Sequence, residues 1–130
     1  MTGRKIEMLL GVNILYFICV IIVPLISIIA GYLMMKKPPE KINNTVGYRT
    51  RRSKASQEAW DFANRYCGRN TFIFGIIIMI VSVIAGIICL KGDTVMGGMG
   101  RMLIIMLIQI ILLVIVMAVP TEIQLKKRFE

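Results

Sequence analysis

Three long stretches of this chain contain no charged residue: residues 8–35, 70–90 and 102–121. An α-helix rises about 1.5 Å per residue, so about 20 residues span the hydrocarbon core of a bilayer. The second and third stretches have this length, whereas the first is longer and is expected to tilt or to reach into the headgroups. Because backbone polar groups in lipid must bond internally, each stretch is predicted to be a transmembrane helix.

The composition agrees with lipid rather than water as the solvent. Hydrophobic residues make up 57% of the 130 residues, compared with roughly 45–50% in soluble domains even when Gly is counted. A signal peptide is the alternative interpretation of residues 8–35, but the stretch is too long for an ordinary apolar core and lacks a clear cleavage site. We therefore predict an all-α membrane protein, a single domain over residues 1–130 with helices at about 8–35, 70–90 and 102–121.

The positive charge of the chain indicates how it is oriented. The net charge is +9, and the basic residues lie outside the apolar stretches, where they meet anionic headgroups rather than nucleic acid. Residues 36–69 hold nine Lys or Arg residues and residues 122–130 hold three, against two before residue 8 and two in residues 91–101. Cytoplasmic segments are enriched in Lys and Arg, so we expect the N-terminus outside and residues 36–69 and 122–130 inside.

The basic segment 36–69 is expected to have structure of its own. Pro38 and Pro39 end the first helix, because a residue before proline avoids helical angles. Residues 40–52 are predicted to be extended or irregular, and Ser53 or Ser56 can cap a short helix over about 54–67 that lies on the inner leaflet with Trp60 at headgroup depth. The alternative is that the second helix begins earlier and projects from the membrane. The Gly-rich residues 91–101 are predicted to be an extracytoplasmic loop, and residues 122–130 a basic tail.

Few polar residues interrupt the apolar stretches, namely Asn13, Ser27, Ser82 and Gln109. None is ionisable, which argues against a proton-coupled transporter. Gln109 is expected to bond to another helix, and the alternative is that it lines a small pore. Ser82 and Gly86 form a small-xxx-small pair that allows close helix approach, and Pro24 should kink the first helix.

The chain lacks the residues of the common catalytic and metal sites. There is no His, and the three cysteines form no CxxC pair, so no zinc site of ordinary spacing exists. No nucleophile and base can be paired with a supporting oxyanion motif. We expect no enzyme activity, no metal and no cofactor.

Residues 43–64, NNTVGYRTRRSKASQEAWDFAN, contain the most varied polar sequence. A purely electrostatic tether would need only Lys and Arg. Gly47 permits a turn with unusual backbone angles, and Arg49 has a planar fork of donors that suits phosphate or carboxylate. The candidate ligand-binding or partner-binding residues are Asn43, Gly47, Tyr48, Arg49, Thr50, Ser53, Ser56, Trp60 and Asn64.

The order and spacing of these residues, followed by two further helices, resemble the signature of the SdpI family of bacterial membrane proteins. The resemblance covers roughly residues 10–120 and implies a role in immunity or resistance to a toxic, membrane-active peptide, with possible signalling to a cytoplasmic repressor. The immunity protein for which the family is named has additional N-terminal transmembrane helices. The resemblance therefore extends to the family domain, but it does not identify the toxin.

Two other classes of function stay open. A small transporter or channel would need several copies of the chain, because three helices enclose little space. A membrane scaffold would use its basic inner face to recruit a cytoplasmic partner. The expected partners are anionic lipids, a toxic peptide, a cytoplasmic regulator and further copies of the chain, in a bacterial cell membrane and without nucleic acid.

The orientation makes a direct prediction. In a cysteine-free background, a cysteine at position 56 should react with an impermeant thiol reagent only from the cytoplasmic side, and a cysteine at position 97 only from outside. Labelling of intact cells and of inverted vesicles measures both. The reverse pattern would overturn the orientation.

Overall fold

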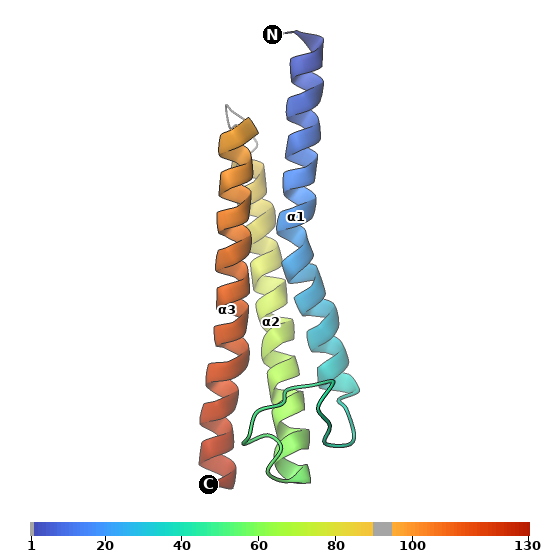
Figure 1. The fold of residues 1–130 in the computed structure, drawn as a ribbon, viewed down its shortest axis with the longest axis vertical. Coiled ribbons are helices and arrows are strands. Elements are labelled where there is room, and N and C mark those ends of the chain that lie inside the picture. Colours follow the sequence, from blue (N-terminus) through green and yellow to red (C-terminus); the bar gives the residue numbers. More distant parts are fainter. Residues whose placement is uncertain (1, 90–94) are drawn as a thin grey trace.

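The structure, a computed structural model, describes residues 2–89 and 95–130. Three long helices follow one another: α1 (Gly3–Lys36), α2 (Gln57–Cys89) and α3 (Val95–Phe129). Figure 1 shows them side by side in an elongated bundle, with α2 antiparallel to α1 and α3. Each helix is long and apolar enough to cross a membrane. The predicted all-α architecture with three membrane-spanning helices is confirmed.

The prediction of a separate interfacial helix over about 54–67 was wrong. α2 begins at Gln57 and continues without interruption to Cys89, so these residues form its first turns. The apolar face expected here exists, since Ala59, Ala63 and Cys67 are buried, but it packs against Tyr48 and α3 rather than against lipid. The alternative, an early start of the second helix, therefore describes the chain.

The third helix is also longer than predicted. α3 begins at Val95, so residues 95–101, expected in a Gly-rich loop, are helical, and residues 91–94 lie outside the described part of the chain. At the other end α3 runs to Phe129, so most of the segment predicted as a basic tail belongs to the helix. Leu125 is buried in contact with the residues that precede and begin α2, and this packing supports the extra turns.

Glycines bring the backbones of α1 and α2 into contact. A Cβ atom on Gly31 would lie 2.4 Å from the backbone nitrogen of Phe72, and one on Gly68 would lie 2.6 Å from that of Met35. Small residues at helix interfaces allow such approach in lipid, where association depends on close packing rather than on the hydrophobic effect. Figure 1 also shows that α1 changes direction part-way along, as Pro24 within it predicts.

The outer surface of the bundle is apolar along most of its length. Large side chains such as Ile14, Ile77 and Leu107 are more than half exposed. A water-soluble protein rarely exposes so continuous an apolar surface, whereas a lipid-facing helix requires it. Most of the charged residues lie instead in residues 36–69 and 122–130, at the end of the bundle that holds residues 37–56.

The contact at Gly68 predicts a test of the helix packing. Gly68→Ala should destabilise the bundle by about 1–3 kcal/mol, because backbone atoms of α1 cannot move aside as a flexible side chain would. Unfolding in mixed micelles of mild detergent and dodecyl sulfate, followed by far-ultraviolet circular dichroism, measures the change.

Gly11→Ala is the matched control. No atom lies within 4 Å of a Cβ at Gly11, so this change should be neutral, or stabilising by up to about 1 kcal/mol through helix propensity. Equal effects of the two substitutions would contradict the close approach of α1 and α2.

Candidate functional site

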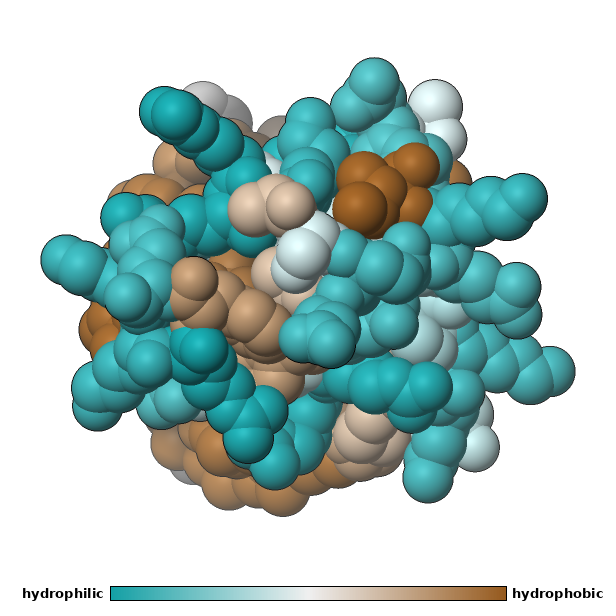
Figure 2. Space-filling view, turned by 90° about the horizontal axis from the view of Figure 1, so that it is seen from below, coloured by the Kyte–Doolittle hydropathy of each residue, from teal (hydrophilic) through white to brown (hydrophobic). Residues whose placement is uncertain are grey.

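The segment from Lys37 to Ser56 crosses the bundle at the end where α1 and α3 finish and α2 begins (Figure 1). Figure 2 looks onto this end and shows hydrophilic side chains projecting around its rim, with apolar surface between them. The predicted irregular conformation of residues 40–52 is confirmed, since no helix or strand is found there. We call residues 37–56 the crossing loop.

The side chains of Trp60 and Asn64 in α2 form hydrogen bonds to the backbone of the crossing loop. Both side chains are fully buried. The Trp60 indole N–H donates to the carbonyl of Pro39 at 2.7 Å, which ties the first bend of the loop to α2. The Asn64 side-chain oxygen accepts from the backbone N–H of Tyr48 at 2.7 Å, and its amide nitrogen donates to the Trp60 carbonyl at 2.9 Å. Trp60 is therefore part of the protein interior and not a headgroup anchor.

Gly47 is required by the geometry beside Asn64. Its φ angle is +103°, a conformation that favours glycine. A Cβ atom at this position would also lie 2.5 Å from the Asn64 side-chain oxygen. Any other residue would have to disturb both the backbone and the hydrogen bond that Asn64 accepts, so Gly47 lets the loop approach α2 closely.

Three hydroxyl side chains of the signature stabilise the turn and the start of α2. The buried Ser53 hydroxyl lies 2.9 Å from the carbonyl oxygens of both Tyr48 and Thr50 and can donate to either. The Thr50 hydroxyl oxygen accepts from the backbone N–H of Ser53 at 3.2 Å. Ser56 is the helix cap, because its hydroxyl oxygen accepts from the N–H of Ala59 at 3.1 Å.

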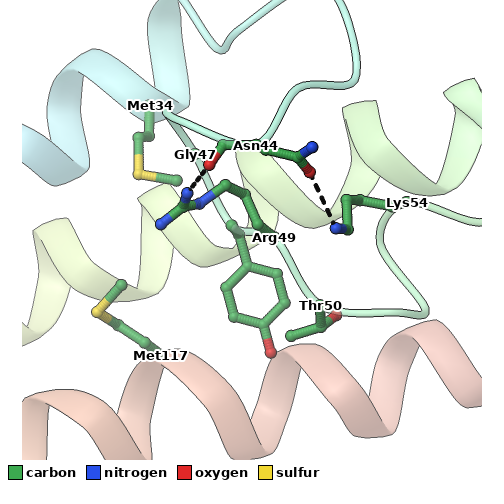
Figure 3. Close-up of a pocket in the computed structure, with 8 residues that line it drawn as sticks. Met34, Asn44, Gly47, Arg49, Thr50, Lys54 and Met117 are labelled. Carbon is green, nitrogen blue, oxygen red and sulfur yellow. Dashed lines mark hydrogen bonds between the residues drawn. The ribbon is translucent and has the colours of Figure 1, made fainter.

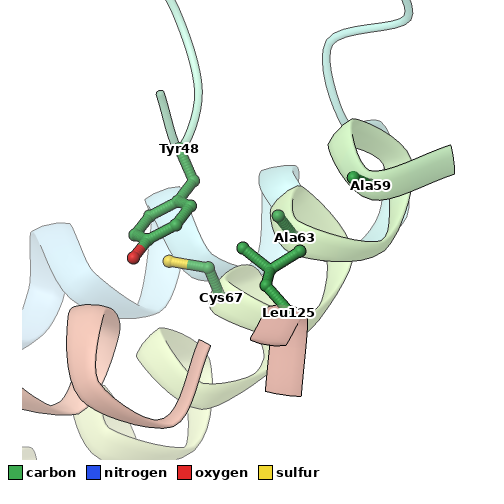
Figure 4. Close-up of a cluster of buried hydrophobic side chains, with 5 residues drawn as sticks. All are labelled: Tyr48, Ala59, Ala63, Cys67 and Leu125. Atoms are coloured by element: carbon green, nitrogen blue, oxygen red, sulfur yellow. The ribbon is translucent and has the colours of Figure 1, made fainter. Parts of the chain in front are cut away.

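Tyr48 connects the crossing loop to α3. Its ring packs beside Cys67, while Leu125 of α3 lies beside Ala63 of α2 (Figure 4). The phenol donates to a carboxylate oxygen of Glu122 at 2.9 Å. Burial, reinforced by this hydrogen bond, raises the pKa of Tyr48 far above its ordinary value. The phenol therefore remains a neutral donor to a carboxylate.

Arg52 makes a second connection to α3. Its guanidinium lies 3.0 Å from Glu122 and 2.9 Å from Glu130 and donates to both carboxylates. Exposed ion pairs contribute little individually, about 0–1 kcal/mol. Here Tyr48 and Arg52 both bond to Glu122. Together these contacts fix the position of the crossing loop relative to α3. We call Tyr48, Arg52, Glu122 and Glu130 the α3 clamp.

Asn44 accepts hydrogen bonds from two cations of the crossing loop, Arg49 and Lys54. The guanidinium of Arg49 donates to the backbone carbonyl of Asn44, and the Lys54 ammonium donates to the Asn44 side-chain oxygen at 3.2 Å. Figure 3 shows both side chains at the wall of a hollow of about 370 Å³ that also reaches Met34 of α1 and Met117 of α3. Nearby, the Asn43 side-chain oxygen accepts from the N–H of Val46 at 2.8 Å and stabilises a turn.

Three of the four polar residues within the apolar stretches make hydrogen bonds between or within helices. Gln109 of α3 is buried and donates to the hydroxyl oxygen of Ser82 in α2 at 2.7 Å and to the carbonyl of Val20 in α1 at 3.2 Å. The predicted bond of Gln109 to another helix is confirmed. Ser27 donates to its own helix at Val23, and Asn13 lies about two turns before Val20, away from this contact.

Comparison with known proteins identifies the family of the chain. The model of the SdpI/YfhL protein family matches residues 40–120, which include most of the crossing loop and the spans of α2 and α3. The chain belongs to the SdpI/YfhL family. It is 41% identical over 61 residues to an uncharacterized protein, YfhL, of Bacillus subtilis strain 168, a match that covers 47% of this chain and 56% of that protein. No solved structure matches the chain.

The structure brings all nine signature residues of this SdpI/YfhL domain to one end of the bundle, but it divides their tasks. Gly47, Ser53, Ser56, Trp60 and Asn64 shape the loop, Tyr48 reaches α3, and Arg49 faces the hollow. Sequence reasoning missed the carbonyl of Pro39 and two acidic partners, Glu122 of α3 and Glu130 directly after it. Acidic residues within an otherwise basic C-terminal segment were the available signal for the two acidic partners.

Asn64 predicts a test of the loop. Asn64→Ala leaves the Tyr48 N–H without its acceptor, and an unsatisfied buried group costs about 1–3 kcal/mol. Opening of the loop should therefore become about tenfold more frequent, and trypsin should cleave after Arg49, Arg51 or Arg52 correspondingly faster. Limited proteolysis in micelles, read by mass spectrometry, measures the rate.

Asn44→Ala is the control for this substitution. The Asn44 side chain is exposed and bonds only to Lys54 among the described residues, so cleavage should change by less than about twofold, as for other surface changes. An unchanged cleavage rate in Asn64→Ala would show that the amide does not hold the loop.

Proposed function

We propose that this SdpI/YfhL-family protein confers resistance to a membrane-active peptide and that the crossing loop responds when the peptide packs against the helices. The observation that carries the proposal is the α3 clamp. It joins the most varied polar segment of the chain to the helix that is least covered by its neighbours. The resemblance to a family named for an immunity protein supports the same role.

The apolar surface of α3 suits a peptide that enters the bilayer. Ile104, Leu107 and Ile111 are more than half exposed and lie along one side of the helix at three-residue and four-residue spacing. An apolar or amphipathic peptide can pack against such a face and be withheld from assembly in the membrane. A shift of α3 on binding would act on Glu122, because this carboxylate is bonded to both Tyr48 and Arg52.

The proposed orientation places the crossing loop and the C-terminal end of α3 in the cytoplasm and the N-terminus outside, in a bacterial cell membrane. The charge distribution supports it, since twelve of the sixteen Lys and Arg residues lie in residues 36–69 and 122–130. A cytoplasmic regulator would then meet the end shown in Figure 2. A homo-oligomer and anionic lipids are the further proposed partners.

The recruitment of a regulator is a second proposed role, favoured by an exposed cation beside the clamp. Arg51 is exposed, and both ion pairs found among the described residues belong to its neighbour Arg52. Arg51 is therefore available to an acidic partner, whereas Arg52 stabilises the protein itself. The transporter alternative receives less support, because Gln109 and Ser82 bond to each other between the helices.

Expression in a sensitive bacterial host tests the resistance proposal. Cells that produce the chain should survive a challenge by a membrane-active peptide better than cells with an empty vector. The peptides tested should include any whose precursor is encoded next to this gene. Unchanged survival with every peptide would contradict the proposal.

Tyr48→Phe tests the clamp within the same assay. This change removes only the hydroxyl that donates to Glu122, a charge-assisted bond of about 1.5–3 kcal/mol, and leaves the ring in place. We expect resistance to fall about tenfold at an equal amount of protein in the membrane, checked by immunoblot. Tyr32→Phe, which removes the hydroxyl of a half-exposed tyrosine of α1, is the matched control and should protect like the unaltered chain. Full protection by Tyr48→Phe would contradict a role of the clamp.

A further inference from the structure

The hollow beside Arg49 borders the α3 clamp at Tyr48, but its two cations, Arg49 and Lys54, take no part in the clamp. It is lined by Met34 of α1, by Met117 of α3 and by six residues of the crossing loop: Asn44, Gly47, Tyr48, Arg49, Thr50 and Lys54. Its volume of about 370 Å³ accommodates a small charged group. Figure 3 shows Arg49 between Met34 on one side and Asn44 on the other, so the hollow has an apolar side and a cationic side.

The charge at this hollow is unbalanced. Arg49 and Lys54 are the charged residues among its lining, and no acidic residue takes part. Within the described residues neither makes an ion pair, because the two ion pairs found there both belong to Arg52. Asn44 accepts one hydrogen bond from each cation, which holds both side chains in position and leaves further N–H donors on each.

The position of the hollow along the helices indicates which kind of anion fits it. Met34 lies two residues before the end of α1, and Met117 lies five residues before Glu122, where the apolar stretch of α3 ends. The cations therefore stand at the level where hydrocarbon gives way to headgroups. A molecule held here has its charge beside Arg49 and Lys54 and an apolar part beside the two methionines.

We propose that this hollow is a binding site for one anionic phospholipid, whose phosphate is held by Arg49 and Lys54 and whose acyl chain runs over Met34 and Met117 between α1 and α3. The planar guanidinium of Arg49 matches two phosphate oxygens, and Lys54 adds a point charge. The proposal goes beyond a general attraction of basic residues to the membrane, because it assigns one site and two side chains. It does not depend on resistance to a peptide.

Lipid retention measured by native mass spectrometry tests the site. The full chain is placed in nanodiscs of equal parts phosphatidylglycerol and phosphatidylcholine and released gently. The unaltered chain should retain one phosphatidylglycerol in preference to phosphatidylcholine. Loss of a charge-assisted contact weakens binding by about tenfold or more, so Arg49→Gln and Lys54→Gln should each reduce retention about tenfold, and Arg49→Lys should reduce it less.

Arg51→Gln is the matched control, since it removes the same charge from the same loop outside the hollow. It should retain the lipid like the unaltered chain, and circular dichroism should show that all variants are folded. Equal loss in Arg51→Gln and Arg49→Gln would overturn the site in favour of diffuse attraction. Equal retention of both lipids by the unaltered chain would also overturn it. Displacement of the lipid by excess inorganic phosphate, with a phosphate adduct in its place, would reassign the site to a free anion.

Discussion

The buried amide of Asn64 is the contact on which the arrangement of the crossing loop depends. Its oxygen accepts from the backbone of Tyr48 and its nitrogen donates to the backbone of Trp60. An amide can serve both groups because it carries an acceptor and donors on one planar unit. The short distance to the loop is possible only because Gly47 has no Cβ and adopts a positive φ. These residues determine where Tyr48 leaves the loop and therefore which part of α3 it reaches.

The crossing loop, once positioned by Asn64, is bonded to α3 through Tyr48 and Arg52. Tyr48 and Arg52 both end on Glu122, which follows directly after the apolar stretch of α3. α1 and α2 are fixed against each other by glycines whose backbones touch, so they have little freedom to slide. α3 is less covered, and its position is set by Gln109 within the bilayer and by the clamp at its end. The crossing loop is thus bonded both to α2, through Trp60 and Asn64, and to α3, through the clamp.

Some of the nine signature residues stabilise the fold, and others are exposed on the surface. Those that are fully buried, such as Trp60, Asn64 and Ser53, shape the protein. The side chains available to other molecules are Arg49 and the neighbouring cations Arg51 and Lys54, which are exposed. A substitution at Trp60 would therefore report on folding, whereas one at Arg49 tests the proposed binding. This distinction matters for experiments on any chain of the SdpI/YfhL family that shares these residues.

The sequence by itself determined the three spans, because uninterrupted apolar stretches of this length have few stable alternatives to helices in lipid. It also located the polar run whose residues meet at one end, and it anticipated the bond that Gln109 makes between helices. The end of α1 before Pro38 and the cap at Ser56 were anticipated. The continuity of α2 could not be predicted from local pattern, since an amphipathic first turn suits a leaflet and a protein neighbour equally well. Tertiary structure decided that Ala59 and Ala63 of α2 face Leu125, and it extended both helices beyond the apolar stretches. It also decided that Glu122, far from Tyr48 in the chain, completes the site, because such pairing depends on how antiparallel helices stand side by side.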